Sequence, residues 1–252
     1  MNIPIDLNWI EAVMLASVRF TTFIFIAPPF SYNAIPAQIK VMLSIGLAIA
    51  VSPRITQNYH SLDTAGFLGA LVLEILVGAA LGFLVMVVFS AMQSAGNLID
   101  MFGGFQLAQA FDPQAMVNGA QFTRLFQMVT VALMFTSGAY QLVLGGLTRS
   151  FTALPIGGGL DLAAPADAMI KATTQMFLAS VQIAGPLIVV LFLADAGLGL
   201  LTRVAPALQA FSMGFPLKIL LTLTLVVVVF VALPQIVESL TSQAVSLLIG
   251  VS

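Results

Sequence analysis

The chain has 252 residues, of which 60% are hydrophobic and only 7% are charged, and its formal net charge is −2. A soluble domain carries roughly 25% charged residues, so this composition excludes an ordinary soluble fold. Neither the net charge nor any run of basic residues suggests a nucleic-acid partner. Cysteine is absent and His60 is the single histidine, which excludes disulfides, iron–sulfur clusters and zinc sites built on two or more histidines. We therefore expect no cofactor and no metal.

Six apolar segments follow one another along the chain, and their lengths favour helices over strands. They cover residues 10–27, 38–51, 66–99, 122–148, 169–200 and 217–249. The second segment is short, because at ~1.5 Å per residue it spans about 20 Å of a hydrocarbon core about 30 Å thick. The sequence thus predicts an all-α, membrane-associated protein.

Turn residues separate these segments. Pro28-Pro29 is expected to end the first helix, Ser52-Pro53 to end the second, and Gly185-Pro186 to kink the fifth. An even number of crossings puts both ends of the chain on one side of the membrane. The basic residues Arg203 and Lys218 flank the last loop and favour a cytoplasmic position for it, which leaves both ends outside.

Several charged residues lie inside apolar segments, where charge is costly at membrane depth, and three of them need particular explanation. Arg19 belongs to the first segment, Glu74 to the third and Asp195 to the fifth. From the residues alone, Asp195 is expected to be a structural carboxylate that pairs with a helix terminus or with Arg203.

Small residues recur on one side of the third helix. Gly78 and Gly82 are spaced by four positions, and Gly96 follows later. In a membrane helix this pattern predicts a face that packs closely against a neighbouring helix.

Residues 102–117 are the most unusual stretch, since they are apolar and bulky yet contain Gly103, Gly104, Pro113 and three glutamines. Irregular backbone is not left facing lipid, so this stretch must be buried in protein or line a wet cavity. One interpretation is a re-entrant connector packed against its own helices. The other is a mobile plug, whose rings and methionines seal a pore by excluding water.

Catalysis finds little support in the residue types. His60 is the only histidine available as a general base, and aspartyl chemistry in the membrane needs two facing aspartates, of which Asp195 is the one deep candidate. We therefore expect no enzyme. Residues 195–218 taken alone indicate the tip of a helical hairpin, with a cytoplasmic loop and basic flanks.

Together these stretches resemble the FliR family, the R subunit of the bacterial flagellar export gate, with its counterpart in type III injectisomes. The resemblance covers nearly the whole chain, and its strength comes from the order and spacing of motifs that are weak individually. They are Arg19, Ala27-Pro28-Pro29-Phe30, Ala34 to Lys40, Glu74 to Gly82, Ala95 to Ile99, Gly104 to Gln114, Ser150 to Gly157 and Leu193 to Lys218, in which Phe211 to Lys218 is the most specific string.

The resemblance implies bent helical hairpins with a re-entrant plug loop. Residues 1–165, including the loop 102–117, would be similar to a P subunit, and residues 166–252 would form a Q-subunit-like helical hairpin. One such chain would close a ring of P and Q subunits around a channel for unfolded flagellar substrates. It would lie in the inner membrane at the flagellar basal body and project partly to the periplasmic side. The B subunit at the cytoplasmic entrance, the A subunit, the basal-body ring and inner-membrane lipid are the other implied partners.

The resemblance also implies roles for individual residues. The plug or gate set is Phe105, Gln106, Leu107, Gln109, Phe111, Asp112, Pro113 and Met116. The assembly or buried-charge set is Arg19, Lys40, Glu74 and Asp195, and Arg19, Glu74 and Asp195 would find partners on neighbouring chains. The cytoplasmic entrance set is Arg203, Pro206, Phe211, Gly214, Phe215, Pro216 and Lys218.

Two alternatives stay open at this point. The host system is either flagellar or an injectisome, and the overall match favours the flagellar one. A small-molecule membrane transporter also uses broken helices with midplane charges. A transporter of that kind is expected to show internal repeats in corresponding halves, and none is evident in the sequence.

Overall fold

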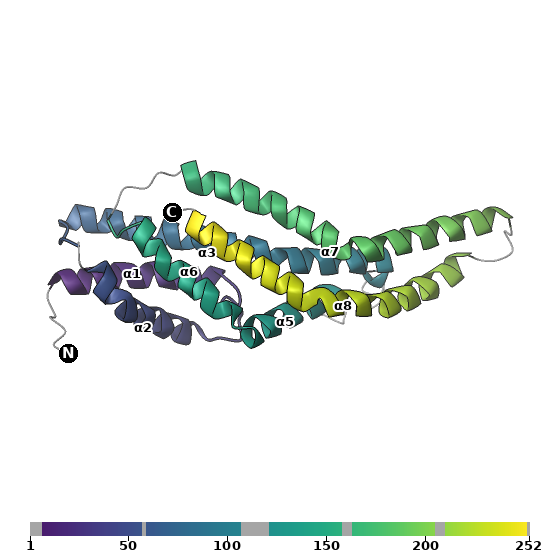
Figure 1. Cartoon of the computed structure of the whole chain (residues 1–252), viewed down its shortest axis with the longest axis horizontal. Helices are drawn as coiled ribbons and strands as arrows, with labels where there is room; N and C mark the ends of the chain where they lie inside the picture. The colour runs from purple at the N-terminus through teal and green to yellow at the C-terminus, as the bar shows by residue number, and fades with distance from the viewer. Residues whose placement is uncertain (1–6, 57–58, 107–120, 158–162, 205–209, 251–252) are drawn as a thin grey trace. The chain divides into compact units, whose positions relative to one another are not determined.

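The computed structural model of the chain describes residues 7–56, 59–106, 121–157, 163–204 and 210–250. Within these ranges every regular element is a helix, which confirms the predicted all-α class. Figure 1 shows them in order: α1 (Leu7–Ile26), α2 (Ala37–Ile55), α3 (Thr64–Gly103), α5 (Gln121–Thr136), α6 (Ala139–Ala153), α7 (Ala163–Val204) and α8 (Ala210–Gly250).

Five of these helices are long and apolar enough to cross a membrane, namely α1, α2, α3, α7 and α8. The bent pair α5 and α6 counts as a sixth crossing if it forms a single span. The count agrees with the predicted membrane character of the chain. The charged residues must therefore be explained in strongly apolar surroundings.

Two of the expected segments differ from the observed helices. The expected fourth segment is not one helix, because α5 and α6 meet at an angle of 75°. Gly138 lies at this break with φ of 75°, a left-handed conformation that ends a helix and suits glycine. The expected second segment was too short, because α2 runs on through Ser52 and Pro53 to Ile55. Pro53 costs the helix the backbone hydrogen bond from position 53 to residue 49, but α2 continues to a length of 19 residues.

The prediction for the fifth segment concerned Gly185-Pro186. α7 continues through Pro186 as a single helix, and Figure 1 shows it bent along its length. A bend is the expected response of a long helix that loses one hydrogen bond to proline.

The described chain forms two compact units. Unit 1 comprises residues 1–88, 134–173 and 239–252, and unit 2 comprises residues 89–133 and 174–238. The helices α3, α7 and α8 each contribute to both units. The predicted division at 165/166 into P-like and Q-like parts is based on likeness to partner subunits and not on packing within the chain. It stays a prediction.

Unit 1 has α1 at its core. The side chains of Leu15, Phe20 and Phe23 are fully buried, and α1 packs against α2. On α3, a Cβ atom placed on Gly78 would lie 2.5 Å from the carbonyl oxygen of Arg19, and one on Gly82 would lie 3.0 Å from Cβ of Ile26. The predicted close-packing face is confirmed here: at Gly78 the two backbones leave no room for a side chain, and at Gly82 the contact is tight.

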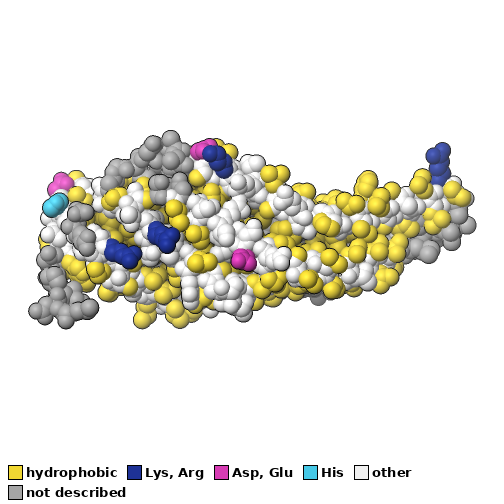
Figure 2. Space-filling view, viewed as in Figure 1, with side chains coloured by type: hydrophobic (Ala, Val, Ile, Leu, Met, Phe, Trp, Pro, Cys, Tyr) yellow, Lys and Arg dark blue, Asp and Glu magenta, His cyan; other side chains and the backbone are white. Residues whose placement is uncertain are grey.

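Unit 2 combines residues 89–103 of α3 with most of α5, α7 and α8. Met92 and Phe126 are fully buried, and the rings of Phe126 and Phe230 pack with centroids 5.8 Å apart. Along α7 and α8, by contrast, many large apolar side chains face outward. Figure 2 shows hydrophobic side chains over the visible face of this hairpin, with few charges among them. In the most apolar window of α8 only 22% of residues are buried inside the chain itself.

Candidate functional site

The candidate site begins where the unusual apolar stretch leaves α3. Of the predicted plug set, Phe105 and Gln106 are described by the structure. The other members, Leu107, Gln109, Phe111, Asp112, Pro113 and Met116, lie outside the described residues. Two described stems therefore flank the loop, residues 96–106 on one side and residues 121–126 on the other. Gly104 has φ of 82°, so the chain turns out of α3 at a position that favours glycine.

Asp100 joins the two stems. It is fully buried on α3, and its carboxylate accepts hydrogen bonds from three donors near the start of α5. The backbone N–H of Phe122 donates to Oδ1 at 3.0 Å, and the backbone N–H and hydroxyl of Thr123 donate to Oδ2 at 2.9 and 3.0 Å. The first N–H groups of a helix have no partner inside the helix, so Asp100 caps α5 from another helix. Its negative charge also complements the positive end of the α5 dipole.

Close packing accompanies this cap. A Cβ atom on Gly96 would lie 2.7 Å from the carbonyl oxygen of Phe122, so the first turn of α5 rests on the bare backbone of α3. The rings of Phe105 and Phe122 meet edge to face, with centroids 5.1 Å apart. The Gln106 amide donates to Oδ1 of Asn97 at 3.1 Å. The two described members of the predicted plug set thus contact other residues of the stems.

The start of α8 lies against the same stem. A Cβ atom on Gly103 would lie 2.8 Å from the hydroxyl of Thr222, and one on Gly104 would lie 3.1 Å from the ring of Phe215. Phe215 belongs to the predicted entrance set, so in unit 2 the structure brings one entrance residue into contact with the loop stem.

An ion pair holds α7 to α8 in the same region. Nζ of Lys218 lies 2.7 Å from Oδ1 of Asp195. The expected partners of Asp195 were a helix terminus or Arg203, and the observed partner is Lys218, since the two antiparallel helices bring positions 195 and 218 opposite each other. Within this chain the Asp195 side chain is 44% exposed, and its burial in an assembly stays a prediction.

The remaining entrance residues are only partly described. Arg203 is exposed at the end of α7. Gly214 is buried, and a Cβ atom there would lie 3.2 Å from a methyl group of Leu198. Pro216 is exposed inside α8. Pro206 and the side chain of Phe211 lie outside the described residues.

The other predicted charges cluster in unit 1. Arg19 and Glu74 are almost completely buried, and the guanidinium pairs with both carboxylate oxygens. Nη2 of Arg19 also donates to the carbonyl oxygen of Leu154 at 2.9 Å, and Nη1 donates to the hydroxyl of Ser150 at 3.3 Å. The expected partners on neighbouring chains were wrong for this pair, because these donors and acceptors belong to one chain. The ring of Phe151 completes the cage, 4.1 Å from the guanidinium carbon.

Lys40 is buried as predicted. Its ammonium donates to the carbonyl oxygen of Ser31 at 2.9 Å and lies 5.2 Å from the centre of the Phe25 ring. These contacts tie the start of α2 to the turn that follows α1.

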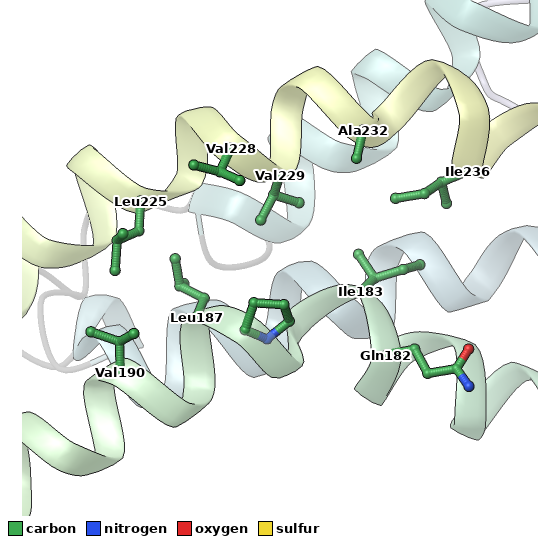
Figure 3. A pocket seen from close by; sticks show the side chains of 10 residues that line it. Gln182, Ile183, Leu187, Val190, Leu225, Val228, Val229, Ala232 and Ile236 are labelled. Carbon is green, nitrogen blue, oxygen red and sulfur yellow. The ribbon is translucent and has the colours of Figure 1, made fainter.

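An apolar cleft of about 320 Å³ lies between α7 and α8. Figure 3 shows its lining, which is apolar except for Gln182. A pocket that binds a polar solute needs several polar groups placed to converge on it. This cleft suits an aliphatic group and gives no support to transport of a polar small molecule.

Among the described residues, no group of three or more histidine, cysteine, aspartate or glutamate side chains is placed to hold a metal ion. The expectations of no cofactor and no enzyme stay predictions.

Comparison with known proteins identifies the family. The model of bacterial export proteins, family 1, matches residues 10–244. The chain belongs to this family. The flagellar biosynthetic protein FliR of Escherichia coli K12 is 30% identical over 242 residues, covering 96% of this chain and 93% of the relative. FliR of Bacillus subtilis 168 is 30% identical over 255 residues, covering 97% and 95%. The Yop proteins translocation protein T of Yersinia pestis is 27% identical over 175 residues, covering 68% and 67%. The resemblance to the FliR family is thereby confirmed.

Sequence reasoning missed some residues that organise the site in this export-family chain. Asp100, Thr123 and Thr222 were not singled out from the sequence. A capping aspartate is normally found directly before its helix. Asp100 lies more than twenty positions away from its donors, so no local spacing rule points to it.

Proposed function

We propose that the chain is a non-catalytic core subunit of the bacterial flagellar type III protein export gate. In this role it closes a ring of P and Q subunits, and its central loop plugs the channel through which unfolded flagellar substrates pass. The observation that carries the proposal is the match to flagellar FliR proteins along nearly the whole chain. The tethered stems of the loop support the plug, because a seal requires that the sealing residues be held at a defined place.

The exposed apolar surface supports a place in a larger assembly. Large side chains on α7 and α8, such as Phe192, Val204 and Val231, are more than 60% exposed. Contiguous apolar surface of this kind is covered either by lipid or by protein. We propose that P and Q subunits cover part of it in the inner membrane, and that the rest faces lipid.

The loop between α7 and α8 is proposed to lie at the cytoplasmic entrance, where it meets the B subunit. Arg203 and Lys218 flank this loop, and a basic loop favours the cytoplasmic side. The A subunit, the basal-body ring and a partial projection to the periplasmic side complete the proposed setting.

An injectisome role is the second candidate. The 27% identity to the Yersinia pestis translocation protein supports it. That match covers 68% of the chain, against 96% for the Escherichia coli flagellar protein, so the flagellar role is favoured.

Deletion of residues 106–113 tests the plug. The variant is coexpressed with P and Q subunits, the complex is purified and reconstituted into vesicles, and potassium efflux is recorded. We expect the complex to form and efflux to rise well above that of the wild type. Gly69→Ala is the matched control, because a Cβ atom at this exposed position of α3 meets nothing within 4 Å. Unchanged efflux from an intact complex would reject the plug, and a stable solitary protein that ignores P and Q subunits would reject the assembly role.

A further inference from the structure

We propose that Asp100 is a positioning residue of the export gate: its buried carboxylate sets the two stems that hold the proposed plug. The inference rests on the proposed function, since it assumes that residues between the stems seal the channel. It adds a specific requirement, which is that the seal depends on a capping interaction outside the sealing residues.

The first argument is that Asp100 serves α5 and not its own helix. All three donors it binds come from Phe122 and Thr123, at the start of α5. The residue that precedes α5 in the sequence is Ala120, whose side chain has no acceptor. Without Asp100, the buried N–H of Phe122 and its neighbour would lack their partner.

The second argument is that the contact is dry and closely fitted. Asp100 is 0% exposed, so water does not compete for its oxygens. Gly96, one turn earlier on α3, lets the backbone of Phe122 approach, and the Phe105 ring packs on the Phe122 ring. Packing sets the separation of the stems, whereas the directional hydrogen bonds of Asp100 set their register along the helix axes.

The third argument concerns cost. A carboxylate inside an apolar chain is expensive to bury, and it is retained where its hydrogen bonds are satisfied. Hydrogen bonds to a charged acceptor are stronger than neutral ones. Removal of the carboxylate therefore releases the start of α5 and the stem that leads to the proposed plug.

The test uses the whole complex with P and Q subunits and two measurements. Hydrogen exchange followed by mass spectrometry reports on the peptide that covers residues 121–126, and potassium efflux from vesicles reports on the seal. For Asp100→Ala we expect exchange in that peptide to rise roughly tenfold or more, because buried amides lose their acceptor. We expect efflux to rise toward that of the 106–113 deletion. Thr123→Val loses one bond and should fall between the wild type and Asp100→Ala.

Asp63→Ala is the matched control. Asp63 accepts from the N–H of Gly66 at 3.1 Å and so caps α3 at an exposed place in unit 1. Its loss should leave exchange at 121–126 and efflux unchanged, which shows that removal of any capping aspartate is not sufficient.

The outcomes separate the inference from the proposed function. If exchange rises in Asp100→Ala but efflux stays at the wild-type level while the deletion leaks, Asp100 is structural and the inference is wrong. Unchanged exchange in a leaking or a tight complex would also overturn it. If the deletion itself does not leak, the plug is rejected together with the inference. Should Asp100→Ala fail to assemble, Thr123→Val decides, because it keeps the carboxylate and both backbone hydrogen bonds. Raised exchange together with raised efflux in this variant supports the inference. Raised exchange with wild-type efflux contradicts it.

Discussion

The guanidinium of Arg19 on α1 forms a bidentate ion pair with the carboxylate of Glu74 on α3, and both side chains are almost completely buried. This two-point geometry uses two of the guanidinium's N–H donors and both oxygens of the glutamate. Two further donors bind Ser150 and the backbone of Leu154, which brings in the end of α6. One charged group thus ties three helices of unit 1 together.

Glu74→Gln is expected to destabilise unit 1. Removing one partner of a buried ion pair leaves the other charge uncompensated, at a cost of about 3–5 kcal/mol. The yield of assembled complex and its midpoint of thermal unfolding should both fall. Asp167→Asn is the control, since the Asp167–Lys171 pair is mostly exposed and such pairs contribute about 0–1 kcal/mol. Equal stability of the two variants would contradict the structural role of the Arg19 pair.

Gly78→Ala should separate α1 from α3. The added Cβ atom would lie 2.5 Å from the carbonyl oxygen of Arg19, and backbone atoms do not move aside as a flexible side chain does. We expect a loss of about 1–3 kcal/mol, typical of overpacking. Gly69→Ala on the same helix should be neutral or slightly stabilising, because alanine favours helix and the site is open. Thermal unfolding of the two purified variants compares them directly, and a neutral Gly78→Ala would reject the close contact.

Charge reversal tests the Asp195–Lys218 pair. Lys218→Glu places two negative groups opposite each other and should reduce secretion and assembly. The double variant Asp195→Lys with Lys218→Glu restores the attraction and should recover much of the loss, although the partly exposed pair is worth only about 0–1 kcal/mol. Lys171→Glu in the exposed pair of α7 is the control.

Asp195→Asn should weaken assembly; normal complex yield with lost secretion would instead indicate a direct part in transport.

The phenol of Tyr59 is expected to make the folding stability fall at alkaline pH. It lies between α2 and α3, and burial, followed by the hydrogen bond to Glu11 and the charge of Glu11, raises the pKa of its phenol from 10.0 to about 12. The folded state therefore favours the protonated phenol. The stabilisation is fully present below pH 10 and is lost as the pH rises toward 12. Ultraviolet titration of phenolate should show a late-titrating tyrosine that disappears in Tyr59→Phe; identical titrations of the two proteins would refute the shift.

Hydropathy and length were sufficient to predict the all-α class, because apolar runs of 18 residues or more have few alternatives to a membrane helix. The same hydropathy pattern predicted one continuous helix through Gly138, where the structure has a break. Nothing in the apolar pattern marks that position, and a lone glycine is common inside membrane helices. At Ser52-Pro53 the turn signal was given too much weight, since proline is tolerated in a helix whose neighbours compensate.

For the charged residues too, the sequence predicts some features and not others. That Arg19 and Glu74 need partners followed from the cost of burial, whereas the identity of those partners depends on how the helices pack. Lys218 was placed correctly in the hairpin, yet its pairing with Asp195 depends on the offset between two antiparallel helices. Asp100 shows the limit most clearly, because its donors are remote in sequence and no periodic pattern connects them.

The last turns of α8 belong to unit 1. There Leu248 packs closely on Gly146 of α6, since a Cβ atom placed on Gly146 would lie 2.9 Å from Cδ1 of Leu248. During translation these turns leave the ribosome after every other part of that unit. Completion of unit 1 therefore waits until synthesis has passed residue 248.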